Sequence, residues 1–140
     1  MPCPFCEIVA GRAPASIVHR DDACMAFLTL RPVRPGELLV IPLVHVDHMT
    51  DLDDALAAHL FLTAQRLARH ARNVLRPLRM GYVVHGFGVA HAHLIVVPQH
   101  AEDDILSGRH VHAPGGWTVI EGPEVDRAAL DAMAVRLRLR

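Results

Sequence analysis

Apolar residues recur at helical spacing over one long stretch of the chain, from Thr50 to about Arg76. Because residues three or four positions apart lie on the same side of a helix, this spacing predicts a single apolar stripe. Acidic residues gather at the start of the stretch and arginines in its second half, the arrangement that the helix dipole favours. Pro77 ends it. The stripe consists of Leu52, Leu56, Leu60, Ala64, Leu67, Ala71 and Val74.

Shorter apolar runs before and after this helix predict strands. SIVHR and CMAFLTL, separated by the turn-forming DDA, are typical of an antiparallel hairpin. The prolines of RPVRPGE predict a loop, and the nearly continuous apolar run of ELLVIP predicts a strand buried on both faces. GYVVHGFG and VAHAHLIVVP predict two further strands, of which the second carries His91 and His93.

The two ends of the chain add helices. CPFCEIVAG predicts one short helical turn ended by Gly11, and EVDRAALDAMAVRLRL predicts a closing amphipathic helix. WTVIEG predicts a short strand, whereas residues 99–116 hold too many helix and strand breakers for a regular element. Strands grouped together, without helices alternating between them, predict an α+β fold with a mainly antiparallel five-stranded meander sheet. The length of 140 residues suits one domain, residues 1–140.

Composition and charge narrow the classes of function. The hydrophobic fraction of 51% and the charged fraction of 21% are ordinary for a globular protein. The formal net charge of -1 argues against nucleic acid as a partner. Because no apolar run reaches roughly 18 residues and the N-terminus lacks the basic-then-apolar pattern of a signal peptide, we expect a cytoplasmic protein with no membrane partner.

Three cysteines are too few for a disulfide framework, but Cys3 and Cys6 have the C-x-x-C spacing of metal ligands. A redox motif is disfavoured because no strand precedes it. A tetrahedral site needs two more ligands, and a four-cysteine site is impossible with three cysteines. His45, just after the ELLVIP strand, and a histidine of HAH are the best-placed candidates. The alternative is that Cys3 and Cys6 are reduced and pack as small hydrophobes, the role we expect for Cys24.

His91 and His93 belong to an excess of eleven histidines. On a strand they point to one face, where one imidazole can attack phosphorus while a partner holds its other nitrogen. The alternative is a hydrogen-bonded pair without chemical importance. The glycines before them favour the close approach of an anion. We expect the other histidines at loop and surface positions to be ordinary surface residues: His59, His70, His100, His110 and His112.

The segments CPFCEIVAGRAPASIVHRDDACMAFL, RPVRPGELLVIPLVH, the long helix and HAHLIVVP occur in this order over about residues 3–100. They resemble the histidine triad (HIT) family, whose members are mostly nucleotide hydrolases and transferases that act on P–N or P–O bonds to a nucleoside monophosphate. The resemblance implies a HIT-like fold, a purine nucleotide or nucleotide conjugate as ligand, and a homodimer. Residues 101–140 form a variable C-terminal segment with no motif.

In that family the signature is H-φ-H-φ-H-φ-φ, often followed by proline, and the middle histidine is transiently nucleotidylated. Counting back from Pro98, the resemblance implies that His91 is the first histidine and His93 the nucleophile, and puts Ile95 at the third position. Sliding the register so that His91 is the nucleophile fits less well, because two extra residues then precede Pro98. The resemblance also implies a structural zinc ion, with Cys3, Cys6, His45 and His91 as its ligands.

Other positions depart from the family. Thr29 replaces an aspartate that grips the ribose, and Phe87 and Gly88 replace a polar pair before the triad, so phosphate contacts fall to backbone N–H groups such as that of Gly88. Isoleucine at position 95 neither donates a hydrogen bond nor carries charge. Two hypotheses follow: an enzyme that works through a nucleotidyl-histidine intermediate, or a zinc-stabilised module of the same fold that binds a nucleotide or anion without turning it over.

Overall fold

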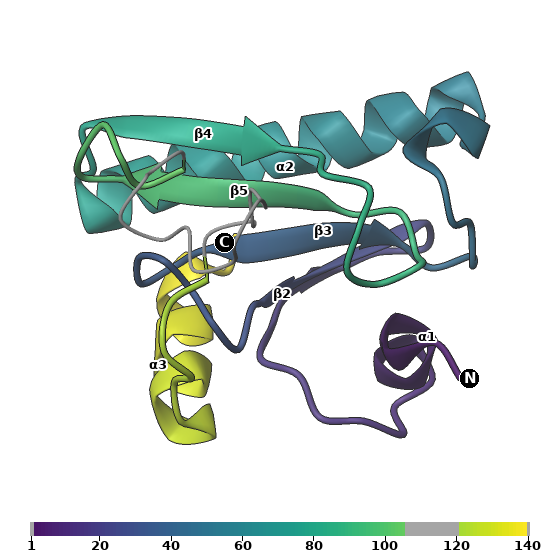
Figure 1. Cartoon of the computed structure of the whole chain (residues 1–140), viewed down its shortest axis with the longest axis horizontal. Helices are drawn as coiled ribbons and strands as arrows, with labels where there is room; N and C mark the ends of the chain where they lie inside the picture. The colour runs from purple at the N-terminus through teal and green to yellow at the C-terminus, as the bar shows by residue number, and fades with distance from the viewer. Residues whose placement is uncertain (1, 106–120, 140) are drawn as a thin grey trace, which may run out of the picture.

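Five antiparallel strands form one sheet with helices against it in the computed structural model, which describes residues 2–105 and 121–139 (Figure 1). The strand order β1-β2-β3-β5-β4 confirms the expected α+β fold. The sheet is a meander only from β1 to β3, because β5 lies between β3 and β4. The strands are β1 (Ile17–Arg20), β2 (Cys24–Leu28), β3 (Leu38–Pro42), β4 (Arg79–Val83) and β5 (Leu94–Gln99).

The hairpin of β1 and β2 turns on Asp21. One carboxylate oxygen of Asp21 accepts hydrogen bonds from the backbone N–H groups of Ala23 and Cys24, each over 2.8 Å. Aspartate favours turns because its side chain replaces a backbone acceptor in this way. The DDA sequence therefore forms the tight connection that the sequence predicts, and the second oxygen of Asp21 remains available to other partners.

The long helix α2 (Asp54–Leu75) begins four residues later than the apolar pattern predicts. Asp53 is its N-cap and accepts a hydrogen bond from the N–H of Leu56 over 2.8 Å. The preceding residues form the short 3-10 helix η1 (Met49–Asp51), so Leu52 is buried outside the helix. The apolar stripe is confirmed by the helix residues buried against the sheet: Leu60, Ala64, Leu67, Ala68 and Ala71.

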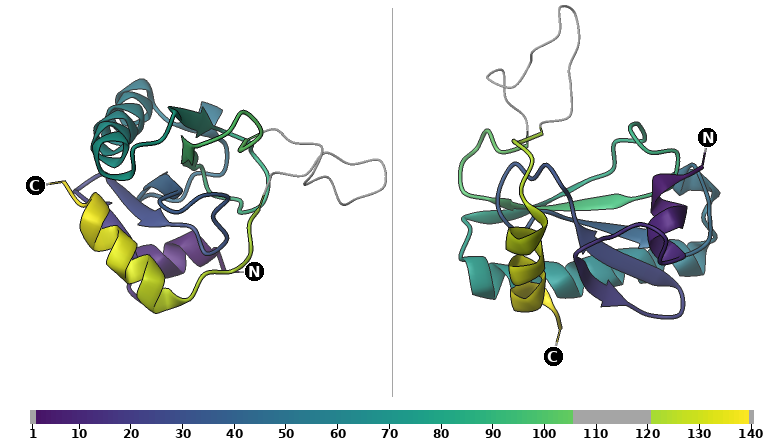
Figure 2. Two further views of the ribbon diagram at one scale, coloured as in Figure 1. Left: turned by 90° about the vertical axis from the view of Figure 1, so that its left-hand side faces the viewer. Right: turned by 90° about the horizontal axis from the view of Figure 1, so that it is seen from below.

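The helices cover the two faces of the sheet unequally. Helix α2 and the C-terminal helix α3 (Arg127–Leu137) pack against one face, in a core that includes Cys24, Val40 and Leu94. The short helix α1 (Pro4–Val9) packs against the other face, where Phe5 meets Phe27. Helices α1 and α3 lie at opposite ends of the sheet (Figures 1 and 2). None of the helices in the described ranges is both long and apolar enough to cross a bilayer.

One strand prediction is wrong at the position of the histidines. Strand β5 begins at Leu94, so His91 and His93 lie in the irregular segment that joins it to β4. Gly86 and Gly88 have φ values of 80° and 88°. The N–H of His91 bonds to the carbonyl of Val89 over 2.8 Å, so the backbone makes a turn here and does not pair with a neighbouring strand. The closing helix is confirmed as α3, whereas most of the WTVIEG segment lies outside the described residues.

Candidate functional site

Four side chains from distant parts of the chain converge at the α1 end of the sheet. The ligand atoms of Cys3, Cys6, His45 and His91 all lie within 4.8 Å of one another. The Sγ atoms of Cys3 and Cys6 lie 3.4 and 3.6 Å from Nδ1 of His91, and Sγ of Cys6 lies 3.3 Å from Nδ1 of His45. Tetrahedral zinc separates its sulfur and nitrogen ligands by about 3.5 Å, so the cluster has the dimensions of such a centre.

Helix α1 positions the two cysteines. Cys3 is its N-cap, Pro4 occupies the first turn, where its missing N–H costs nothing, and the N–H of Cys6 points to Sγ of Cys3 over 3.5 Å. One turn of helix thus places both sulfur atoms on one side. Burial and the neighbouring Cys3 raise the pKa of the Cys6 thiol. Because its pKa is raised, this thiol needs a nearby cation, such as a metal ion, to be stable as the thiolate.

His91 is fully buried, and its tautomer is fixed by the backbone. Its Nε2 lies 2.9 Å from the carbonyl oxygen of Pro42, at the end of β3. Because a carbonyl only accepts, Nε2 must carry the proton, and the lone pair is on Nδ1, which faces Cys3 and Cys6. Burial lowers the pKa of His91, which favours the neutral imidazole. The side chain is therefore held in the form that binds a metal ion.

The neighbouring His93 is held in the opposite tautomer, again by a backbone carbonyl. Its Nδ1 lies 2.7 Å from the carbonyl oxygen of His91, so Nδ1 donates and the lone pair is on Nε2. The ring of Phe5 lies edge-on to both imidazoles, with centroids 5.7 Å from His91 and 5.5 Å from His93. His93 is half-buried, and in its neutral form the lone pair of Nε2 lies opposite the hydrogen bond that Nδ1 makes.

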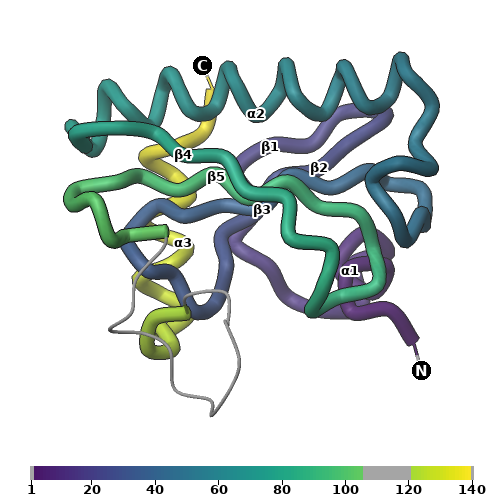
Figure 3. The backbone as a smooth tube through the Cα atoms, turned by 45° about the horizontal axis from the view of Figure 1, so that its top comes forward, coloured from purple at the N-terminus to yellow at the C-terminus, as the bar shows by residue number. Residues whose placement is uncertain are grey.

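The residues expected to bind substrate are divided between two places. Phe87 and Gly88 lie in the segment 84–93, which approaches α1 (Figure 3), and Phe87 is 77% exposed. The space beside the Cα atom of Gly88 is open, and its φ of 88° is a conformation that glycine favours. Thr29 instead follows β2 at the α3 end, where its N–H bonds to the carbonyl of Glu37 over 3.3 Å. Gly88 thus lies in the same connecting segment as His93, whereas Thr29 lies just after the end of β2.

Ile95 lies at the third position of the triad as a buried residue of β5. It pairs with Leu39 on one side and Val83 on the other. The alternation of β5 sends Leu94 and Val96 into the core against α2, and Ile95 to the face that carries His93. An apolar side chain thus stands at the third position of the triad, buried in the sheet.

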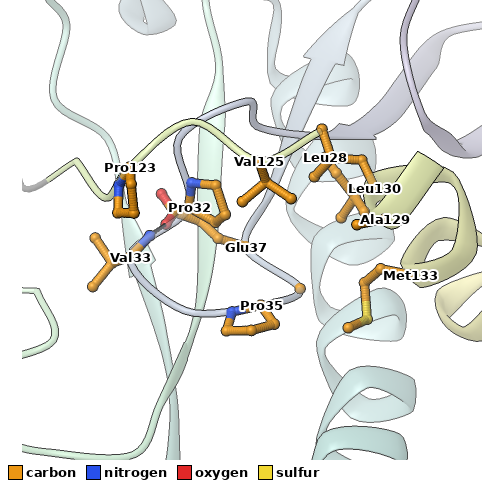
Figure 4. Close-up of a pocket in the computed structure, with 11 residues that line it drawn as sticks. Leu28, Pro32, Val33, Pro35, Glu37, Pro123, Val125, Ala129, Leu130 and Met133 are labelled. Atoms are coloured by element: carbon orange, nitrogen blue, oxygen red, sulfur yellow. Dashed lines mark hydrogen bonds between the residues drawn. The ribbon is translucent and has the colours of Figure 1, made fainter. Parts of the chain in front are cut away.

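A separate cavity of about 350 Å³ opens between α3 and the loop 29–37, away from these histidines (Figure 4). Its lining is apolar except for Glu37, which is only 7% exposed. Burial raises the pKa of Glu37 to about 7. Glu37 was not among the residues predicted from the sequence, although a glutamate at the start of the otherwise apolar ELLVIP run is the signal that points to it.

Comparison with known proteins supports the resemblance to the HIT family. The HIT domain profile matches residues 10–102. The chain belongs to the HIT domain family. Protein hit of Bacillus subtilis is 31% identical over 107 residues, which are 73% of this chain and 74% of that protein. HIT membership places the chain in a superfamily of nucleotide-binding hydrolases and transferases.

Two solved HIT structures resemble the fold over much of the chain. A zinc-bound histidine triad family protein from Mycobacterium smegmatis is 29% identical with a TM-score of 0.74, and the match covers 98% of this chain and 96% of that one. A HIT family hydrolase from Legionella pneumophila is 32% identical with a TM-score of 0.59, over 69% of this chain and 91% of that one. The expected HIT-like architecture is thereby confirmed.

Proposed function

We propose that this HIT protein cleaves a P–N or P–O bond at the α-phosphate of a purine nucleotide derivative, with His93 as the nucleophile. The hydrogen bond from Nδ1 of His93 to the carbonyl of His91, over 2.7 Å, carries the proposal. It presents the lone pair of Nε2 without a proton transfer, and it stabilises the positive charge that an imidazole gains when Nε2 bonds to phosphorus. The hydrolase of Legionella pneumophila supports the class of reaction.

The proposed reaction has two steps. In the first, Nε2 of His93 forms a bond to the α-phosphorus, and the amine, phosphate or nucleotide leaves with the electron pair of the broken bond and gains a proton from water. In the second, water attacks the same phosphorus, the nucleoside monophosphate departs, and Nε2 recovers its lone pair. A transferase would use a different acceptor in place of water.

Stabilisation of the phosphate oxygens is assigned to the backbone of the segment before the triad. Ile95 has no hydrogen to donate. The open position and positive φ of Gly88 give an anion access to the main chain, where backbone N–H groups stabilise developing charge. Phe87 offers an exposed ring at the same segment, on which a nucleotide base can stack.

We further propose that Cys3, Cys6, His45 and His91 hold a zinc ion. The set contains two sulfur and two imidazole ligands at tetrahedral spacing, a donor set that zinc prefers. The zinc-bound relative from Mycobacterium smegmatis supports this choice of metal. With four protein ligands the ion would be structural, joining α1 to the end of β3 and to the segment that carries His93.

The experiment that tests the enzyme is AMP release from adenosine 5′-phosphoramidate and, separately, from a diadenosine polyphosphate. The wild-type protein is compared with His93→Asn and with a His48→Asn control, whose side chain is 69% exposed. We expect AMP from the wild type and the control and none from His93→Asn. If the folded, zinc-loaded wild type releases no AMP from either substrate, the proposed reaction is wrong.

A second candidate function is a nucleotide-binding module without turnover. The observation that favours it is the apolar Ile95, buried in β5 two residues after His93. Thr29 adds to it, because a single hydroxyl, which accepts a bond from the N–H of Arg31 over 3.4 Å, stands in place of the family's aspartate. Calorimetric binding of AMP in the absence of any product would favour this module over the enzyme.

A homodimer and a cytoplasmic location remain predictions. Strands β1 and β4 are the two edges of the sheet, and exposed edges favour cover by another chain. Sedimentation of the purified protein at several concentrations measures the assembly directly.

A further inference from the structure

A second cluster of metal-ligating side chains lies where the β1–β2 hairpin meets α2. Ligand atoms of His19, Asp21 and Cys24 lie within 4.8 Å of one another. One carboxylate oxygen of Asp21, Oδ2, is 3.0 Å from Nε2 of His19 and 3.5 Å from Sγ of Cys24. The same oxygen is 2.8 Å from Nε2 of His59, which reaches it from the second turn of α2. His59 is not within 4.8 Å of every member of that group, but it meets the same oxygen of Asp21 that His19 and Cys24 contact.

The hairpin fixes the position of the carboxylate before any ligand arrives. The other oxygen of Asp21, Oδ1, is engaged by the N–H groups of Ala23 and Cys24. The carboxylate cannot rotate without breaking both bonds, so Oδ2 is held toward the histidines and the thiol. Thr63 supports the sulfur from α2, with its hydroxyl 3.7 Å from Sγ of Cys24. Outer contacts of this kind orient ligands and strengthen metal binding.

The cluster is closed on one side and open on the other. Cys24 is fully buried, whereas the side chains of His19, Asp21 and His59 are 18%, 30% and 43% exposed. An ion can therefore enter from the histidine side and meet the sulfur at the inner end. His59, the most exposed of the four, has room to turn its ring about the incoming ion.

We propose that His19, Asp21, Cys24 and His59 form a second binding site, for a divalent transition metal of zinc-like preference. One sulfur, two imidazole nitrogens and one carboxylate oxygen are all ligands that zinc accepts in four-coordinate sites. The site is separate from the Cys3 cluster, because Cys24 faces the core under α2 while Cys3 lies on the α1 side of the sheet.

Binding of the ion requires a rearrangement of protons. In the structure both imidazoles use Nε2 toward Asp21, so each Nε2–H donates to the carboxylate. To coordinate through Nε2, a neutral imidazole moves its proton to Nδ1. Sγ of Cys24 loses its proton to solvent as the metal–sulfur bond forms, because the thiolate is the metal ligand. At least one proton is therefore released for each ion bound.

The three-cysteine sequence allows a direct test with Co²⁺, whose bond to a thiolate gives an intense near-ultraviolet charge-transfer band. In a Cys3→Ser/Cys6→Ser double variant, Cys24 is the one remaining cysteine. Metal-stripped, reduced full-length double variant is titrated with Co²⁺, and far-ultraviolet circular dichroism checks the fold. We expect a thiolate band at one Co²⁺ per chain, lost when Cys24→Ser is added and weakened about tenfold or more in affinity by His59→Asn.

Absence of a thiolate band in the folded double variant overturns the second site. If the double variant does not fold, the zinc content of the wild-type protein decides instead. Two ions per chain that fall to one in His59→Asn and in His19→Asn support the site, and one ion per chain, unchanged by these substitutions, overturns it. None of these readouts depends on nucleotide turnover, so the site and the proposed enzyme stand or fall separately.

Discussion

Nε2 of His91 lies 2.9 Å from the carbonyl oxygen of Pro42, and this bond ties the triad segment to the end of β3. This bond engages Nε2, so Nδ1 is the nitrogen of His91 that faces the cysteines. His45 follows the same strand by three residues, so a single strand end positions one ligand directly and orients another through its backbone. The proposed zinc ligands and the proposed nucleophile are thereby linked, because the carbonyl of His91 in turn holds His93.

Removing one ligand of this cluster is expected to release zinc and loosen α1. Cys6→Ser leaves three ligands, so we expect zinc content to fall from its wild-type level and the melting temperature to drop by several degrees. A strong chelator should produce a similar drop in the wild-type protein and little further change in Cys6→Ser. Inductively coupled plasma mass spectrometry measures the zinc content, and thermal unfolding measures the melting temperature. A His48→Ala control should retain zinc, and equal zinc in Cys6→Ser and wild type would refute the ligand assignment.

The sequence predicts three members of this cluster better than the fourth. Cys3 and Cys6 follow from C-x-x-C, and His45 from its place after a strand, whereas residue spacing alone left open which histidine of HAH joins them. Of the two histidines of HAH, the structure brings His91 to the sulfur atoms, with its Nδ1 3.4 Å from Cys3 and 3.6 Å from Cys6. The strand predicted for residues 89–98 begins only at Leu94. The alternation of residues in VAHAH does not reveal the turn that starts at Val89.

The second cluster shows a different limit of sequence reasoning. His59 was predicted to be an ordinary surface histidine and Cys24 a packed hydrophobe, and each description fits the local pattern. Asp21 contacts both residues, although it lies 38 residues from His59 in the sequence. Contacts at such separation depend on how α2 lies across the sheet, and neither helical periodicity nor strand alternation specifies that arrangement.

Introducing a histidine at the third position tests whether Ile95 limits the proposed reaction. In Ile95→His an imidazole would face the same side of the sheet as His93, where it donates to a phosphate oxygen. Removing one such donor from an enzyme costs about 100-fold in turnover, so we expect a gain of tenfold or more in AMP release. Stability should fall by about 1–3 kcal/mol, because a polar ring replaces a buried apolar side chain. Ile95→Asn is the control, and an equal gain in both variants would exclude a specific histidine effect.

The N-cap of α2 gives a prediction about stability alone. Asp53→Ala removes the acceptor of the Leu56 N–H, so the free energy of unfolding should fall by about 1 kcal/mol. Asp54→Ala, one residue later, keeps the cap and changes the helix dipole interaction by a few tenths of a kcal/mol. Urea unfolding at neutral pH distinguishes the two. A larger loss for Asp54→Ala would place the start of the helix elsewhere.

Glu37 predicts an unusual pH dependence of stability. Its carboxyl lies in the apolar cavity of Figure 4 and accepts a hydrogen bond from the N–H of Val33 over 2.7 Å. Burial raises its pKa from 4.5 to about 7, so between these values the folded protein binds a proton that the unfolded chain has lost. Stability contributed by this group therefore falls as the pH rises from about 4.5 to 7, by on the order of 3 kcal/mol in total.

Glu37→Gln isolates this contribution, because glutamine keeps an acceptor for Val33 and has no proton to lose. Urea unfolding of both proteins from pH 4.5 to pH 8 gives the difference in their free energies of unfolding, from which histidines and other carboxylates cancel. We expect the two proteins to be similar near pH 4.5 and the variant to become progressively more stable up to about pH 7, with no further change above it. The exposed Glu124→Gln serves as the matched control and should follow the wild type. A difference that stays constant across this range would mean that the Glu37 carboxyl ionises in the folded protein as it does in the unfolded chain.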